Sequence, residues 1–218
     1  FREQGTSLLI VSHDKGAIQS LCDRALLLDK GAVVRDGRPE EVMDYYNGLL
    51  LDTGAQAVMQ TKLADGKVKT ISGNGEASVV KIALHNSRDE PIEVAFVGEP
   101  VCLVVQVAVN TVIPSLVLGC GIKDRLGQMM FGTNTYHTGQ LLDAPKIGAM
   151  YEFRIHFDAN LGPGSYSVHI SLVRDPSDMD ANYEWRDNEL VFEVVNKDKY
   201  SFVGSQWNPM HFSIVEYE

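Results

Sequence analysis

Cysteines and long apolar runs are both scarce in this chain of 218 residues. The three cysteines, Cys22, Cys102 and Cys120, are odd in number and far apart, which argues against a disulfide framework and is typical of a reducing cytoplasm. Cys102 and Cys120 stand in apolar runs, where we expect plain buried thiols. No apolar run reaches the roughly 18 residues that a membrane-spanning helix needs, so none is expected. The first residues also lack the basic and apolar stretches of a signal peptide, and none is expected.

Positive charge is short in the second part of the chain. Residues 1–72 carry 9 basic and 10 acidic side chains, whereas residues 73–218 carry 10 basic and 19 acidic ones. Nucleic acids and anionic membrane surfaces bind cationic surfaces, so the sequence predicts neither as a partner of the second part. A neutral ligand, or one that meets local arginine and histidine side chains, fits this charge better.

The first 51 residues alternate between short strands and helices. Apolar residues at helical spacing follow Asp14, which suits a helix N-cap, and Pro39 begins a helix with Glu40 and Glu41 in its first turn. A Lys-Gly turn separates two short apolar runs, which predicts a tight strand pair. We therefore expect a strand at 7–12, a helix at 15–24, strands at 25–29 and 32–35, and a helix at 39–51.

The order of motifs in this segment resembles the C-terminal part of an ABC-transporter nucleotide-binding domain. A strand ends in Ser12-His13-Asp14, and "LCDRALLLDKG" and "VVRDGRPEEVMDYY" follow it. The resemblance implies that His13 corresponds to the switch histidine that contacts the γ-phosphate of ATP. It also implies that residues 1–51 are an incomplete α/β remnant of such a domain.

The motifs that bind and cleave ATP are missing from the chain. It has no G-x-x-x-x-G-K-[ST] loop, no LSGGQ-like signature and no Walker-B carboxylate. One histidine cannot organise phosphoryl transfer without a phosphate cradle and Mg²⁺ ligands, so we expect His13 to be inert and the chain to be no enzyme. Because the chain starts at Phe1 and not at methionine, we expect it to be part of a longer ATPase that uses ATP and Mg²⁺, while the chain itself needs no cofactor.

The remainder of the chain changes from a polar segment to a β pattern. Residues 52–75 are polar and end in Gly-Asn-Gly, which predicts a linker. From Glu76 onward the apolar period is two, with turn sequences such as "DRLGQ" and "DANLGPG" between the runs. Strands are expected at 78–85, 92–96, 101–110, 116–124, 128–132, 151–157, 165–174, 190–195 and 212–217. The sequence therefore predicts a mainly β domain over 76–218: an antiparallel sandwich, immunoglobulin-like or jelly-roll-like.

Alternation places two sets of polar side chains on outward faces. Strands 151–157 and 165–172 have a short connection, which predicts a hairpin with Arg154 and His156 beside His169 and Ser171.

Glycines in strand 116–124 suggest a second outward feature. Gly119 and Gly121 are expected opposite the core-facing side chains and beside Gln106, where they would leave a shallow trough. Glycines that relieve strand curvature are the alternative.

Two segments combine aromatic rings with planar polar groups. "FGTNTYHTGQ" supplies Asn134, Tyr136 and His137 on a loop, and "DMDANYEWRDNE" supplies Tyr183 and Trp185 in a predicted polar loop. Sugars bind such groups, because their hydroxyls need donors and acceptors and their C–H faces stack on aromatic rings. The alternative is that both rings of the second loop pack beneath it as a small core. The candidate carbohydrate-binding residues are Trp185, Tyr183, Tyr136, Asn134, His137, Arg154, His169 and Gln106.

Catalytic and metal-binding patterns do not stand out. The sequence has no H-x-H or H-E-x-x-H spacing and no G-x-S-x-G elbow, so we expect no metal site. A pair of catalytic carboxylates stays open, because acidic residues are abundant.

The full order of segments, with "IKDRLGQMMFGTNT", "NLGPGSYSVHISL" and "NELVFEVV" in the β part, resembles the ATP-binding subunit (Wzt) of bacterial O-antigen polysaccharide ABC exporters. The resemblance implies a cytoplasmic, dimeric carbohydrate-binding module that recognises the capped non-reducing end of the lipid-linked glycan before export. It also implies a membrane subunit as partner, which holds the protein at the inner face of the inner membrane. A polysaccharide-processing enzyme and a pure dimerisation domain are the alternative functions.

The last residues suggest how such a dimer could form. A turn is expected at Trp207-Asn208-Pro209, and the segment "NPMHFSIVEYE" then carries the strand-forming apolar residues Phe212, Ile214 and Val215. A terminal strand on a short hinge can pair with its own sheet or with the equivalent edge of a second copy. We expect exchange between two copies, with an ordinary edge strand as the alternative.

Overall fold

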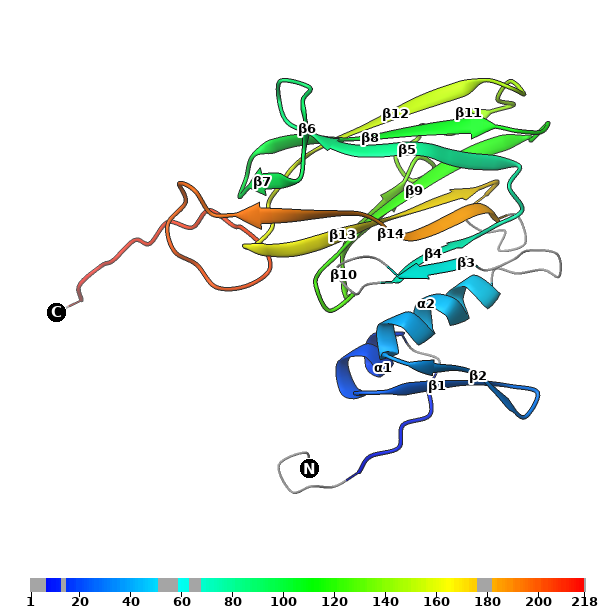
Figure 1. Cartoon of the computed structure of the whole chain (residues 1–218). Coiled ribbons are helices and arrows are strands. Elements are labelled where there is room, and N and C mark those ends of the chain that lie inside the picture. Colours follow the sequence, from blue (N-terminus) through cyan, green and yellow to red (C-terminus); the bar gives the residue numbers. More distant parts are fainter. Residues whose placement is uncertain (1–6, 13–14, 51–58, 63–67, 176–181, 218) are drawn as a thin grey trace.

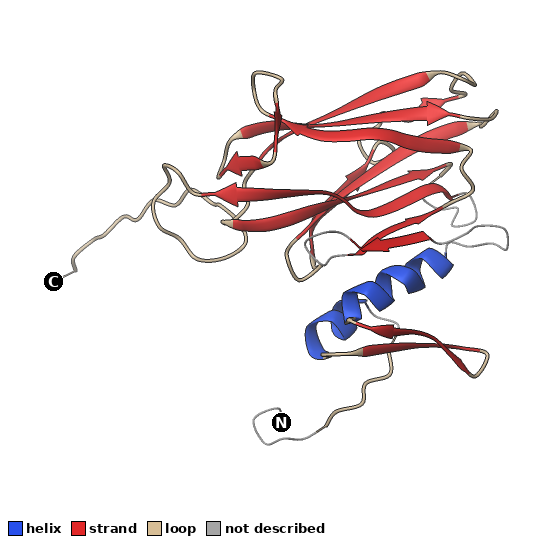
Figure 2. Ribbon diagram, in the orientation of Figure 1, coloured by secondary structure: helices blue, strands red, loops and turns tan. Residues whose placement is uncertain are grey.

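The computed structural model describes residues 7–12, 15–50, 59–62, 68–175 and 182–217 (Figures 1 and 2). A small α/β unit precedes a β-sandwich, as the sequence predicts. The unit contains α1 (Lys15–Leu21), β1 (Ala25–Asp29), β2 (Ala32–Gly37) and α2 (Pro39–Leu50). The strand expected at 7–12 is wrong, because this run has no regular structure and Leu9 is 90% exposed. A strand needs a neighbouring strand for its backbone groups, and none of the described strands pairs with this run.

Two sheets form the sandwich. The larger, eight-stranded sheet has the order β10 (Met129–Asn134), β9 (Ser115–Lys123), β13 (Gly164–Val173), β14 (Asn182–Val195), β4 (Val68–Ser72) and β3 (Met59–Lys62), with β11 (Leu142–Asp143) pairing with β9 and β7 (Val94–Phe96) pairing in parallel with β14. The smaller sheet has the order β12 (Met150–Asp158), β8 (Pro100–Val109), β5 (Ala77–His85) and β6 (Pro91–Ile92). All pairings other than that of β7 are antiparallel, which confirms the predicted mainly β sandwich.

The core lies between the two sheets, where alternate residues of each strand meet. Tyr166 and Phe192 of the larger sheet stack with ring centroids 5.8 Å apart. The buried apolar side chains come from both sheets, as expected for face-to-face packing, and include Leu84, Leu103, Val105, Val107, Leu116, Leu118, Ile170 and Leu172.

Helix α2 packs against the larger sheet through a buried charge. Asp44 Oδ1 of α2 lies 3.7 Å from Lys123 Nζ of β9, and the same ammonium pairs with both carboxylate oxygens of Asp187 on β14. The three side chains are at most 2% exposed. A buried ammonium is tolerated only when opposite charges surround it. The helix is therefore seated at a defined place on the sandwich, below β3 and β4 in Figure 1.

Part of the predicted linker belongs to the larger sheet. Strands β3 and β4 fall within residues 52–75 and pair with each other, and β4 also pairs with β14. The buried side chains of β4 include Thr70 and Ser72, which are hydroxyls, so the strand lacks the apolar alternation on which the prediction relied.

The predicted hairpin of strands 151–157 and 165–172 is wrong. Strand β12 pairs with β8 in the smaller sheet, whereas β13 pairs with β9 and β14 in the larger one. The connection crosses the end of the sandwich, with Ala159 and Leu161 buried. Arg154 and His169 consequently lie on different sheets, because alternation defines the faces of a strand but not its neighbour.

The strand expected at 212–217 is also absent. Trp207 is the last buried residue in the described part of the chain, and the hydroxyl of Tyr200 accepts a hydrogen bond from the Met210 amide at 2.7 Å. Beyond that point the chain runs away from the sandwich (Figure 1), with Phe212 87% and Ile214 94% exposed. The segment pairs with none of the strands that the structure describes.

Candidate functional site

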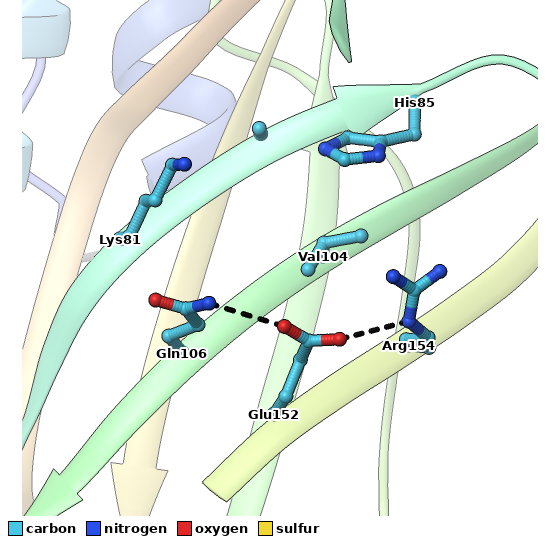
Figure 3. Close-up of a pocket in the computed structure, with 7 residues that line it drawn as sticks. Lys81, His85, Val104, Gln106, Glu152 and Arg154 are labelled. Atoms are coloured by element: carbon cyan, nitrogen blue, oxygen red, sulfur yellow. Dashed lines mark hydrogen bonds and ion pairs between the residues drawn. The ribbon is translucent and has the colours of Figure 1, made fainter. Parts of the chain in front are cut away.

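A shallow pocket lies on the outer face of the smaller sheet (Figure 3). Three neighbouring strands, β5, β8 and β12, build it with outward-facing side chains. We call it the polar pocket, and it is lined by Lys81, Ala83, His85, Val104, Gln106, Glu152 and Arg154. Gln106 and Arg154 belong to the set predicted from the sequence, so the structure brings these two together.

Hydrogen bonds connect the polar groups of the pocket into one network. Gln106 Nε2 donates to Glu152 Oε2 at 3.1 Å, and Arg154 Nε donates to Glu152 Oε1 at 2.8 Å (Figure 3). The two other guanidinium nitrogens of Arg154 donate to the carboxylate oxygens of Asp89 at 2.9 and 3.1 Å. Asp89 Oδ1 also lies 2.9 Å from His85 Nδ1. The side chains are therefore held in place from three strands and the turn after β5.

The network keeps its carboxylates ionised. Hydrogen bonds from Arg154 and then His85 lower the pKa of Asp89 to about 2. Hydrogen bonds from Gln106 and Arg154 lower the pKa of Glu152, and bonds to Asp89 and Glu152 raise the pKa of Arg154. A glycosidase of the usual kind needs one carboxyl with a raised pKa as its general acid. The paired carboxylates of this pocket are suited to accept hydrogen bonds from hydroxyl groups instead.

The outer face of the larger sheet carries a second cluster of side chains, around Trp185. The indole of Trp185 stacks on the imidazole of His169 with ring centroids 4.9 Å apart. A Cβ atom on Gly121 would lie 2.1 Å from His169 Cε1, and one on Gly119 would lie 2.3 Å from Ser171 Oγ. Both glycines therefore make room for side chains of β13.

The trough expected between these glycines and Gln106 is not formed. Strand β9 lies in the larger sheet and β8 in the smaller one, so Gly119 and Gly121 do not neighbour Gln106. The alternation of strand 116–124 was predicted correctly, but the strand next to it was not.

The remaining predicted site residues are scattered. Tyr183 lies in β14 and not in a loop; it is 2% exposed, and its hydroxyl donates to the Ser115 carbonyl at 3.1 Å. Tyr183 is thus a core residue, in line with the alternative that the sequence left open. Asn134 ends β10, and its side-chain oxygen accepts the His137 amide at 2.8 Å. Tyr136 is 50% exposed and meets His137 edge to face. His13 and residues 178–181 lie outside the described residues.

Sequence reasoning missed Lys81, His85, Asp89 and Glu152. Glu152 was recognisable, because it shares an outward face with Arg154 in a clean alternation. Lys81 and His85 were not, because β5 is irregular and its register on β8 shifts between Val79 and Lys81.

Two further features bear on the class of site. Among the residues that the structure describes, no group of three or more His, Cys, Asp or Glu side chains is arranged to hold a metal ion. None of the described helices combines the length and the apolar character needed to cross a bilayer.

Known proteins resemble the chain in fold and in sequence. The sequence model of the Wzt C-terminal domain matches residues 68–207. The crystal structure of the C-terminal domain of wzt superposes with a TM-score of 0.61 at 16% identity, over 67% of this chain and 89% of that one. The O-antigen export system ATP-binding protein RfbB of Myxococcus xanthus is 23% identical over 180 residues, which are 78% of this chain and 41% of that protein.

A second curated relative matches a shorter region. The teichoic acids export ATP-binding protein TagH of Lactococcus lactis subsp. lactis is 48% identical over 46 residues, which are 21% of this chain and 10% of that protein. The chain thus spans less than half the length of these two relatives. The family match covers most of the sandwich, and the solved structure shares its fold. This chain belongs to the Wzt C-terminal domain family.

Proposed function

We propose that this chain recognises a polysaccharide without cleaving it, and that the polar pocket is where the glycan binds. The observation that carries the proposal is the network of Gln106, Glu152, Arg154 and Asp89, which holds planar donors and acceptors in fixed positions on an exposed sheet face. Preorganised groups of this kind suit sugar hydroxyls, because the protein loses little side-chain freedom on binding.

The relatives point to the class of glycan. RfbB is named for O-antigen export and TagH for teichoic acid export. We infer that the ligand is the O-antigen polysaccharide, probed at its capped non-reducing end. The chain would then be the substrate-reading part of a longer ABC exporter subunit, which acts in the cytoplasm with a membrane subunit and uses ATP and Mg²⁺ elsewhere in its length.

We also infer that the domain works as a homodimer. The segment after Trp207 exposes a row of apolar side chains and pairs with no strand of its own chain in the described residues. A second copy could offer a sheet edge to this segment, and exchange of identical segments gives a closed two-fold dimer.

The test of glycan binding uses the O-polysaccharide released from the lipopolysaccharide of the source bacterium. Calorimetric titration should show binding, and chromatography should recover the polysaccharide at its original length. Gln106→Ala and Glu152→Gln should each weaken binding at least about tenfold, as is usual for central contact residues. Shortened polysaccharide would favour a processing enzyme, and absence of binding would favour a pure dimerisation domain.

Trp185→Ala serves as the matched control on the opposite sheet. Its indole is stacked on His169, so we expect the variant to bind the polysaccharide as the unaltered chain does. If Trp185→Ala loses roughly 1–3 kcal/mol while Gln106→Ala and Glu152→Gln are silent, the glycan binds at the larger sheet around Trp185, as the sequence predicted.

A further inference from the structure

The alternation of strand β5 between core-facing and outward-facing side chains shifts by one residue in the middle of the strand. Val79 faces Val107 of β8, but the next pair is Lys81 with Gln106, so Val80 is an extra residue on the β5 side. Before this bulge Ala77 and Val79 point into the core; after it Ile82 and Leu84 do. Successive strand residues alternate between faces, so if the alternation ran unbroken from Val79, Lys81 and His85 would point into the core. The bulge is what turns them toward the polar pocket.

Side chains from the opposite sheet hold the backbone at the start of this bulge. The Val79 amide donates to Glu184 Oε2 at 2.6 Å, and the Val79 carbonyl accepts from Arg186 Nη2 at 2.6 Å. Both side chains come from β14 of the larger sheet. Two charged side chains of the larger sheet thus hydrogen-bond to both the amide and the carbonyl of Val79 in the smaller sheet.

The two charged side chains are themselves paired. Arg186 Nη2 donates to Glu184 Oε1 at 2.9 Å, and Arg186 Nη1 donates to Glu189 Oε1 at 3.1 Å. Burial lowers the pKa of Arg186, but hydrogen bonds and charges of Glu184 and Glu189 outweigh burial and raise it, so the guanidinium stays charged. The Glu184 and Arg186 side chains are 10% and 16% exposed. Hydrogen bonds to charged groups in such places are stronger than those between neutral groups.

We propose that Glu184 and Arg186 are positioning residues for the polar pocket, because they fix the β5 bulge that presents Lys81 and His85 to the ligand. Neither residue lines the pocket. They hold the Val79 backbone from the other sheet, and this contact determines which side chains of β5 face outward. The proposal rests on the proposed function for its ligand, but its structural part can be measured without any ligand.

The experiment compares two substitutions of the same residue. Glu184→Gln keeps a side-chain oxygen that can accept the Val79 amide, whereas Glu184→Leu has a similar size and no acceptor. A third variant, Tyr166→Phe, loses the buried hydrogen bond from the Tyr166 hydroxyl to the Gly162 carbonyl and leaves the bulge untouched. It controls for a general loss of stability.

Binding of the released O-polysaccharide and amide hydrogen exchange are measured on all three variants. We expect Glu184→Leu to weaken binding at least about tenfold and to speed exchange at residues 81–85 relative to β9, and Glu184→Gln to stay near the unaltered chain. Tyr166→Phe should lower the unfolding midpoint and leave binding within about twofold.

The outcomes separate the two proposals. If Glu184→Leu leaves exchange at residues 81–85 unchanged, or if Tyr166→Phe weakens binding as much as Glu184→Leu does, the positioning role is wrong. If exchange rises only in Glu184→Leu but the unaltered chain binds no polysaccharide, the bulge is clamped as described and the proposed function fails.

Discussion

Asp89 illustrates how single residues of the pocket depend on their neighbours. Its carboxylate has a pKa of about 2 in the folded chain, below the ordinary 3.8, mainly because Arg154 donates two hydrogen bonds to it. A carboxyl with a lowered folded pKa stabilises the fold above its unfolded pKa, and this contribution is lost as the pH falls toward 2. Because Asp89 is exposed, the effect on stability is small, and its titration is the better measurement.

We predict that Arg154→Met raises the pKa of Asp89 toward its ordinary value. Carboxyl ¹³C NMR during an acid titration would measure the pKa of Asp89 directly in the unaltered chain and in Arg154→Met. His85→Ala is the weaker counterpart, because His85 is the smaller of the two influences. An unchanged Asp89 titration in Arg154→Met would show that the ion pair does not persist in solution.

Gly121 offers a second test at this scale. An added Cβ would lie 2.1 Å from His169 Cε1, and His169 is held in its stack on Trp185. Gly121→Ala should therefore displace the imidazole, lower the free energy of unfolding by about 1–3 kcal/mol and change the Trp185 fluorescence. Gly139→Ala is no suitable comparison because its φ is positive, whereas Gly132→Ala, with its nearest neighbour at 3.6 Å, should have a smaller effect.

At the scale of the elements, helix α2 is attached to the sandwich through a buried charge. Lys123→Met leaves the carboxylates of Asp187 and Asp44 buried without their cation. We predict a loss of about 3–5 kcal/mol in the free energy of unfolding in urea. Asp44→Asn should cost less, because Asp187 still neutralises Lys123.

The exposed ion pair of Arg24 and Asp36 supplies the comparison for that measurement. Its side chains are 70% and 41% exposed, so water screens the pair and Asp36→Asn should change stability far less than Lys123→Met does. If Lys123→Met is as mild as Asp36→Asn, helix α2 is not held on the sandwich by this charge.

The elements also show what sequence patterns can reveal. Period-two alternation located most of the sandwich strands, and capping and turn residues located α1, β1, β2 and α2, since these signals are local. Strand partners depend on contacts far apart in the chain, and so β12 and β13 were wrongly joined. The polar strand β4 lacks the alternation, so its segment was predicted to be a linker. The bulge in β5 interrupts the alternation, so Lys81 and His85 could not be recognised as pocket residues.

The predicted site fared unevenly for the same reason. Gln106 and Arg154 were chosen for planar polar side chains on outward faces, and they do share a pocket. Tyr183 was chosen because acidic and polar neighbours suggested a loop, but its segment continues β14 into the core. Residue type indicates what a side chain can bind, while only the fold decides which side chains meet.

At the scale of the whole molecule, the proposed dimer depends on the exposed C-terminal segment. We predict a dimer in solution and, after deletion of Met210–Glu218, a folded monomer, because the deleted residues would pair with the second copy. Light scattering at micromolar concentration measures both masses. A monomeric intact chain would contradict the dimer, and a folded, dimeric truncated chain would place the two-fold contact elsewhere.

Strand β14 has one mechanical consequence for the molecule. Its neighbouring residues Arg186 and Asp187 point to opposite faces of the sheet. Arg186 donates a hydrogen bond to the Val79 carbonyl, and Asp187 pairs with the Lys123 ammonium beside helix α2. A shift of the β14 register by one residue would turn each side chain to the opposite face of the sheet, and both interactions would be lost together. The register of β14 therefore sets the positions of both helix α2 and the bulged strand of the polar pocket.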